Sequence, residues 1–113
     1  MATSSPEITR IDSHQHFWLR ERGDYEWLGS HLSAIYRDFL PSDLRVILDQ
    51  ANISQTVLLQ AADTDSETNF LLKLAQETNF ITGVVGWVDM EDRSTPRRLE
   101  ILTKNNFLKA FGP

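Results

Sequence analysis

Two strand-length segments of the sequence, 55–60 and 82–88, are apolar at consecutive positions instead of alternating between apolar and polar residues. Strands of this kind are buried on both faces, which is typical of parallel sheets covered by crossover helices. Further strands are predicted at 9–16 and 107–111, and segments with helical spacing separate all four. The pattern predicts an α/β fold of three to four parallel strands and three helices, either a piece of a barrel or an open sheet.

The first predicted helix spans 41–51. Pro41 suits the first helical position because its missing N–H would have no partner there. Asn52 can adopt the left-handed conformation that ends a helix. Apolar residues at helical spacing predict one buried stripe, which consists of Leu44, Ile47, Leu48 and Ala51.

Polar residues mark the starts of two further helices. Thr64 and Glu67 have the spacing of a capping box, in which the carboxylate of Glu67 reaches back to the backbone of Thr64. Thr95, followed by Pro96, is the predicted cap of the third helix. We expect that helix to end at 105–106, before the fourth strand.

Composition excludes several classes of protein. The chain has 11 Lys and Arg against 16 Asp and Glu, a net charge of −5, and no basic run that would bind nucleic acid or an anionic membrane. It has no Cys, which excludes disulfides and Cys-type zinc sites. No apolar run approaches the roughly 18 residues of a membrane helix, and the pattern of a secretion signal is missing. We therefore expect a cytoplasmic protein, with residues 1–8 as a flexible leader.

The strongest chemical signal is the His-x-His pair of His14 and His16. Side chains alternate along a strand, so both imidazoles are expected on one face at the carboxyl end of the first strand, where α/β folds place their sites. Such a pair can hold a divalent metal ion, most commonly zinc, and Asp12 shares their parity and can orient a ring. We interpret both histidines as catalytic and metal-binding residues; the alternative is a hydrogen-bonded structural pair.

Six other residues are candidates for substrate binding. Aromatic residues after the first strand can wall a pocket or bury their own loop, and an arginine can bind a carboxylate or be solvated. Gln60 and Asp89 follow the apolar runs of the second and third strands, and Trp87 lies just inside the third; the alternative roles for these residues are helix capping and loop hydrogen bonding. The candidates are Trp18, Trp27, Arg37, Gln60, Trp87 and Asp89. The remaining histidine, His31, lies in a polar stretch and is expected to be solvated.

Six runs of sequence, in this order, carry a resemblance to a known family: IDSHQHFW (11–18), YEWL (25–28), YRDFLP (36–41), VLLQAA (57–62), ET with LL (67–72) and GVVGWVD (83–89). They resemble the amino end of the amidohydrolase-related family (the amidohydrolase 2 group), in the branch of sugar lactonases such as L-fuconolactonase and L-rhamnonolactonase. The agreement covers nearly the whole chain.

The resemblance implies that residues 9–113 are a partial barrel domain, the amino-terminal part of a (β/α)₈ barrel. It also implies a hydrolase that directs water at a lactone or amide carbonyl. In this family the pair that matches His14 and His16 faces the site. Members polarise the carbonyl with a metal ion, or with basic side chains where no metal is needed. The family's further histidines and its late-strand aspartate have no match within this sequence.

We therefore expect a lactonase-like lineage, with no activity of the 113 residues alone. The alternative is a non-catalytic remnant, or an α/β domain that binds a small molecule or a protein, and whether the polypeptide is itself an enzyme stays open. The expected partner is a lactone or sugar acid, not nucleic acid or a membrane. Unpaired edges of a partial sheet favour self-association.

Overall fold

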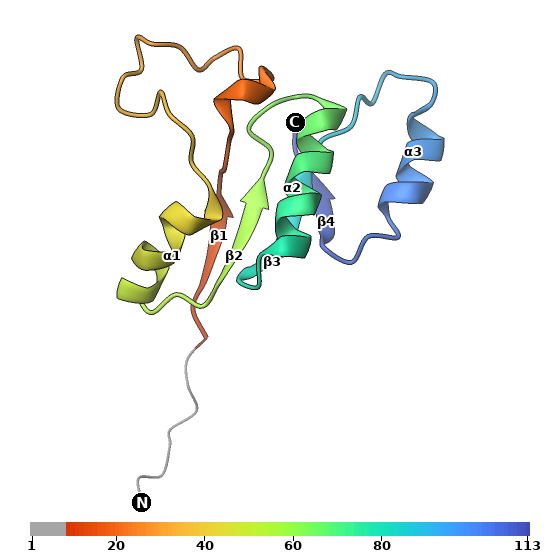
Figure 1. Cartoon of the computed structure of the whole chain (residues 1–113). Helices are drawn as coiled ribbons and strands as arrows, with labels where there is room; N and C mark the ends of the chain where they lie inside the picture. Colours follow the sequence, from red (N-terminus) through yellow and green to blue (C-terminus); the bar gives the residue numbers. More distant parts are fainter. Residues whose placement is uncertain (1–8) are drawn as a thin grey trace, which may run out of the picture.

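A computed structural model of the chain describes residues 9–113, and the predicted leader at 1–8 lies outside the described residues. Strands and helices alternate along the described chain (Figure 1). Their bounds are β1 (Ile11–Gln15), the 3₁₀ helix η1 (Arg20–Arg22), α1 (Pro41–Gln50), β2 (Gln55–Leu59), α2 (Asp65–Glu77), β3 (Ile81–Gly86), α3 (Thr95–Leu102) and β4 (Leu108–Phe111). The predicted α/β fold of parallel strands and intervening helices is confirmed.

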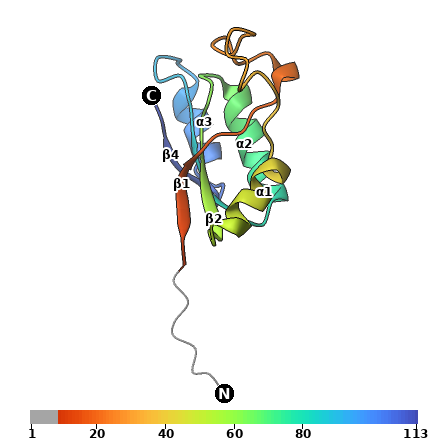
Figure 2. The same ribbon diagram turned by 90° about the vertical axis from the view of Figure 1, so that its left-hand side faces the viewer.

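The four strands form one parallel sheet in the order β1-β2-β3-β4, so each strand after β1 pairs with the one that precedes it in the chain. Right-handed crossovers between such neighbours place the connecting helices on one face of the sheet. Figure 2 shows α1 and α2 together on one side of the strands. The carboxyl ends of all four strands therefore meet at one edge of the sheet.

The core lies between the helices and the sheet. Leu58 of β2 and Val84 of β3 are neighbours in register, and both are fully buried together with Leu71 of α2. Burying a side chain of this size stabilises the fold by roughly 1.5–3 kcal/mol. The cluster of buried core residues is Phe17, Leu48, Leu58, Leu71, Leu72, Ala75, Phe80, Ile81, Val84, Val88 and Leu102.

The predicted ends of the first two helices are confirmed in part. Asn52 follows α1 with a φ of 57°, in the left-handed region. Thr64 caps α2, and its hydroxyl accepts a hydrogen bond from Glu67 N at 2.9 Å. The return half of the predicted capping box is wrong. The Glu67 carboxylate is fully buried and accepts from Ala61 N instead of the Thr64 backbone.

Two expectations about helix surfaces and ends need correction. Thr95 is the first residue of α3 rather than its cap, because its hydroxyl donates to Asp89 O, and α3 ends before the predicted 105–106. On α1, Leu48 is buried as predicted, but Ile47 is 58% exposed. This helix connects β1, an edge strand with one neighbour in the described chain, to β2, so it lies near the edge of the sheet and less of its surface meets the core.

The second face of the sheet carries half-buried apolar side chains. Val57, Leu59 and Val85 lie on it, because they alternate along their strands with Leu58 and Val84, which face the helices. β1 and β4 each pair with a single strand among residues 9–113, and self-association through these edges stays a prediction. Within the same residues, the structure has no helix with the length and apolar character needed to cross a membrane.

Candidate functional site

His14 and His16 lie together at the carboxyl end of β1. Their Nε2 atoms are 3.1 Å apart, and their ring centroids are 4.9 Å apart. The structure therefore places the two imidazoles side by side, as the alternation of a strand requires. His14 is exposed and His16 is half-buried.

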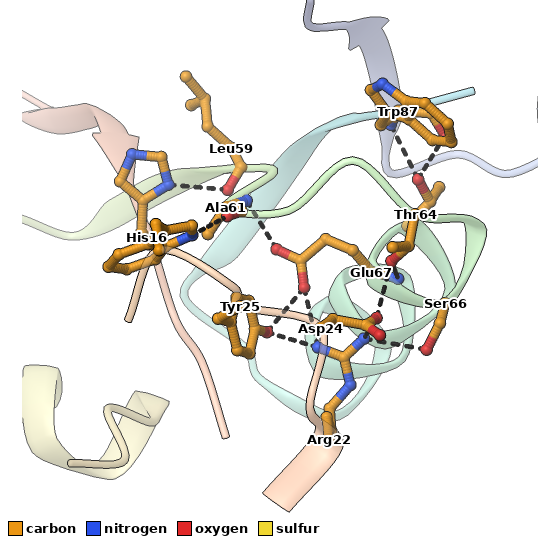
Figure 3. Close-up of polar contacts among 12 residues, drawn as sticks. His16, Arg22, Asp24, Tyr25, Leu59, Ala61, Thr64, Ser66, Glu67 and Trp87 are labelled. Atoms are coloured by element: carbon orange, nitrogen blue, oxygen red, sulfur yellow. Dashed lines mark hydrogen bonds and ion pairs between the residues drawn. The ribbon is translucent and has the colours of Figure 1, made fainter. Parts of the chain in front are cut away.

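A backbone carbonyl orients the ring of His16. Its Nδ1 atom lies 3.0 Å from the carbonyl oxygen of Leu59 (Figure 3). Because a carbonyl oxygen only accepts, Nδ1 carries the proton and Nε2 presents a lone pair toward His14. Leu59 is the last residue of β2, so the pairing of β1 with β2 positions this acceptor.

Asp12 does not orient either imidazole, contrary to expectation. Its carboxylate accepts from the backbone N–H of His14 at 3.2 Å and from the side-chain amide of Gln15 at 2.9 Å. The pairing of β1 with β2 shifts register between Asp12 and Gln15. This irregularity breaks the simple alternation that predicted a shared face for Asp12 and the histidines.

The histidine pair fits a shared divalent ion. Two nitrogen atoms that bind one zinc ion at about 2.0–2.1 Å each lie at most ~4.2 Å apart. The 3.1 Å between the two Nε2 atoms meets that limit, and it is also the length of a hydrogen bond between the two rings, the structural alternative. Within residues 9–113, no group of three or more His, Cys, Asp or Glu side chains is placed to hold a metal. The pair therefore supplies at most part of a ligand set.

Trp18 and Trp27 form an aromatic wall beside His16. Their ring centroids are 5.2 Å apart and their planes meet at 88°. Each indole N–H donates to a backbone carbonyl, Trp18 to Arg37 O at 2.8 Å and Trp27 to Ala61 O at 2.7 Å. His16, the two tryptophans and Ala61 line a hollow of about 440 Å³. The structure thus gathers three candidate residues around one concave surface.

Arg37 and Gln60 lie near this hollow without lining it. The guanidinium of Arg37 stacks 4.0 Å from the centre of the Phe39 ring. Arg37 and Phe39 border a smaller hollow that also touches His16. Gln60 follows β2, and its Oε1 fills the space that a Cβ on Gly112 would need. The amide of Gln60 therefore reaches across the strand ends toward β4.

Trp87 and Asp89 make local contacts. The buried hydroxyl of Thr68 donates to Trp87 O at 2.6 Å and accepts from Trp87 N at 2.8 Å. Asp89 is exposed, and its carboxylate accepts from Glu91 N at 2.9 Å. In the described part of the chain no hydrogen bond or ion pair joins either residue to the histidine pair, and their roles in substrate binding stay predictions.

A buried polar network that was not predicted from the sequence surrounds Glu67, whose side chain is 0% exposed. The carboxylate accepts from Arg22 Nη1 at 2.9 Å, from the Tyr25 hydroxyl at 2.7 Å and from Ala61 N at 2.7 Å (Figure 3). A signal was present: Glu67 lies one helical turn before Leu71 on the apolar stripe of α2. A carboxylate on such a stripe faces the core and needs partners.

The network predicts alkaline sensitivity. Burial, reinforced by the hydrogen bond to Glu67, raises the pKa of the Tyr25 phenol far above its usual range. The folded state thus retains a proton that the unfolded state releases above about pH 10. Stability is complete below that pH and decreases above it, by up to about 1.4 kcal/mol per pH unit. In urea titrations between about pH 9 and 11, Tyr25→Phe should flatten this decrease, whereas Tyr36→Phe should not. An unchanged slope in Tyr25→Phe would contradict the assignment.

Comparison with known proteins finds no matching family model. The chain is 38% identical over 104 residues to an L-fucono-1,5-lactonase of Burkholderia ambifaria, a match that covers 92% of this chain and 36% of the relative. It is 41% identical over 81 residues to an L-fucono-1,5-lactonase of Burkholderia multivorans, which covers 72% of this chain and 27% of the relative.

Solved structures of similar proteins agree with these sequence matches. A crystal structure of an amidohydrolase from Burkholderia multivorans with bound zinc superposes with a TM-score of 0.75 at 36% identity, over 82% of this chain and 33% of that one. A crystal structure with bound HEPES gives a TM-score of 0.83 at 35% identity, over 92% and 36%. The chain spans about a third of the length of the relatives it matches.

Proposed function

The chain belongs to the amidohydrolase-related family of these lactonases, and from this premise we propose that residues 9–113 are one part of a (β/α)₈ barrel that hydrolyses a sugar lactone. The observation that carries the proposal is the pair of imidazole Nε2 atoms 3.1 Å apart beside an aromatic hollow. Both features lie at the carboxyl ends of parallel strands, where barrel enzymes build their sites.

His14 and His16 would hold the metal ion of this site, and zinc is the ion we propose. The Leu59 carbonyl keeps the proton of His16 on Nδ1, so that Nε2 is free to act as a ligand. A divalent ion bound there supplies Lewis-acid chemistry that polarises a carbonyl and acidifies water. Support for zinc comes from its presence in a related amidohydrolase structure.

The other candidate residues would bind and orient the lactone. The indole faces of Trp18 and Trp27 offer an apolar wall for the C–H face of a sugar ring and exclude water from it. Arg37 borders the smaller hollow at His16, and its guanidinium suits the carboxylate that opening a lactone creates. The predicted set is completed by the residues that follow β2 and β3, which are Gln60, Trp87 and Asp89.

A non-catalytic binding module is the second candidate, for a polypeptide of these 113 residues alone. The observation that favours it is the lack, within residues 9–113, of a third metal-binding side chain near the histidine pair. General acid–base groups typically contribute 10²–10⁴ in rate. The match covers only 36% of the length of the Burkholderia ambifaria lactonase. We expect no lactone hydrolysis by the 113-residue polypeptide.

A chimera tests the proposed function. The 104 matched residues of the Burkholderia ambifaria lactonase would be replaced by the corresponding residues of this chain. If this chain retains a working part of the site, the chimera should hydrolyse L-fucono-1,5-lactone within about 100-fold of the parent, because the pair and its wall are supplied intact. Lactone consumption in a pH-stat assay measures the result, with the unmodified lactonase as the control.

The chimera must be shown to fold before its activity is judged. Circular dichroism and a cooperative urea transition report on folding. A folded chimera that binds zinc but leaves the lactone unhydrolysed would contradict the proposed function and favour the binding module.

A further inference from the structure

Glu67 joins the start of α2 and the loop before it to a segment more than 40 residues earlier in the sequence. Its Oε1 atom accepts from Arg22 Nη1 and the Tyr25 hydroxyl, which belong to the long connection after β1. Its Oε2 atom accepts from Ala61 N, in the loop between β2 and α2. Since the carboxylate is fully buried, its two oxygens hold these segments together without competition from water.

The peptide of Ala61 links Glu67 to Trp27 of the aromatic wall. Its N–H donates to Glu67 at 2.7 Å, and its carbonyl accepts from the indole N–H of Trp27 at 2.7 Å. Trp27 in turn packs edge-on against Trp18 and borders the hollow beside His16. An unbroken chain of contacts therefore leads from Glu67 to the site.

Paired charges hold Glu67 in place. Arg22 also bonds to Asp24 at 2.9 Å and to Ser66 at 3.0 Å, and Thr64 donates to Asp24 at 2.7 Å. The guanidinium lies 4.2 Å from the centre of the Phe70 ring. The guanidinium is thus held by partners in its own segment and in α2, so the network has few ways to rearrange.

We propose that Glu67 is a positioning residue for substrate binding: through the Ala61 peptide it fixes the indole of Trp27 over the hollow beside His16. This inference rests on the proposed function for its substrate, a sugar lactone, but the positioning itself does not depend on catalysis. Glu67 is not among the residues that line the hollow. Its influence reaches the hollow through Ala61, which lines it and holds the indole of Trp27, and through Tyr25, whose ring lies 6.1 Å from that of Trp27.

Hydrogen exchange of the indole protons tests the positioning directly. The chain has three tryptophans, and in a ¹⁵N-labelled 113-residue chain each indole gives one NMR signal, assigned by Trp→Phe variants. Glu67→Gln has one acceptor oxygen instead of two and cannot serve both sides of the network. Exchange of the Trp27 indole proton should rise roughly tenfold, the loss of about one hydrogen bond. Exchange at Trp18 should change less than about twofold, because its acceptor is Arg37 O.

Glu77→Gln is the matched control, since Glu77 is an exposed residue on the same helix. It should leave all three indole signals unchanged. An unaffected Trp27 signal in Glu67→Gln would overturn the proposal. An equal acceleration at all three indoles would also overturn it, because that is the signature of general loosening.

The unmodified chain provides a second test, which remains valid if the Glu67→Gln variant fails to fold. If Ala61 transmits the effect, the protection factors of its amide proton and of the Trp27 indole proton, each taken relative to the intrinsic exchange rate of that group, should agree within about threefold, because one opening event exposes both. A protected Ala61 amide beside a freely exchanging Trp27 indole would overturn the link.

The chimera provides the functional measurement. There, Glu67→Gln should raise KM for L-fucono-1,5-lactone roughly tenfold and change kcat less than about twofold, with unchanged zinc affinity. A loss of kcat at constant KM would overturn the proposed role in binding. If the chimera is inactive in every form, the proposed function fails, while the exchange measurements still decide whether Glu67 positions Trp27.

Discussion

His14→Ala and His16→Ala are each expected to lower the zinc affinity of the chain by at least about 100-fold. This is more than the usual effect of removing a residue that only hydrogen-bonds to a metal ligand. The reason is that the two Nε2 atoms, 3.1 Å apart, are the only pair of converging imidazoles among the described residues. In the active chimera, either variant should reduce lactone turnover on the order of 10³-fold, because polarisation of the carbonyl is lost. Isothermal titration with zinc and the pH-stat assay measure the two effects.

His31→Ala is the matched control for both histidine variants. His31 is exposed and lies in the connection before α1, outside both hollows at His16. Zinc affinity and turnover should remain within about twofold of the parent. Retention of zinc by His16→Ala at parental affinity would show that the metal is held elsewhere, and the assignment of the pair would then be wrong.

Phe17→Ala is expected to reduce the free energy of unfolding by about 3–5 kcal/mol, the range for truncating a buried aromatic side chain. Phe17 is 2% exposed, and it is the residue between His16 and Trp18 whose side chain enters the core. Small domains are stable by only about 5–15 kcal/mol, so the variant should be largely unfolded in moderate urea. Circular dichroism during urea titration measures the change.

Two further variants distinguish the effect of the cavity that Phe17→Ala leaves in the core from other effects of substitution. Phe17→Leu keeps most of the buried volume and should lose less than about 1.5 kcal/mol. Ile101→Ala removes a side chain that is 63% exposed and should change stability by no more than about 0.5 kcal/mol. A Phe17→Ala chain as stable as the Ile101→Ala chain would mean that the aromatic ring is not part of the core.

The architecture could be predicted because its signals are local and agree with each other. Consecutive apolar residues predicted β2 and β3, and Pro41, Asn52 and Thr64 lie at the helix ends they indicated. Where prediction failed, the cause was tertiary packing, which the local sequence does not determine. Ile47 fits the helical stripe of α1, yet it stays exposed because an edge strand gives that helix little to pack against.

The site was less predictable than the fold. Strand alternation placed His14 and His16 together, but it could not foresee the shift of register that turns Asp12 away from their rings. The partners of the site are mostly backbone atoms, such as the carbonyls of Leu59 and Ala61. Residue types carry no information about carbonyls, so only the three-dimensional pairing of strands reveals them.

The strand order has a consequence for how this protein is made. Among residues 9–113, each strand after β1 pairs with the strand synthesised just before it, so none of these three pairings has to wait for a distant part of the chain. Contacts of short sequence separation form early and at a small entropic penalty. We expect β1, α1 and β2 to pack while the later units are still emerging from the ribosome, with the imidazole at position 16 meeting its carbonyl partner before α2 is complete.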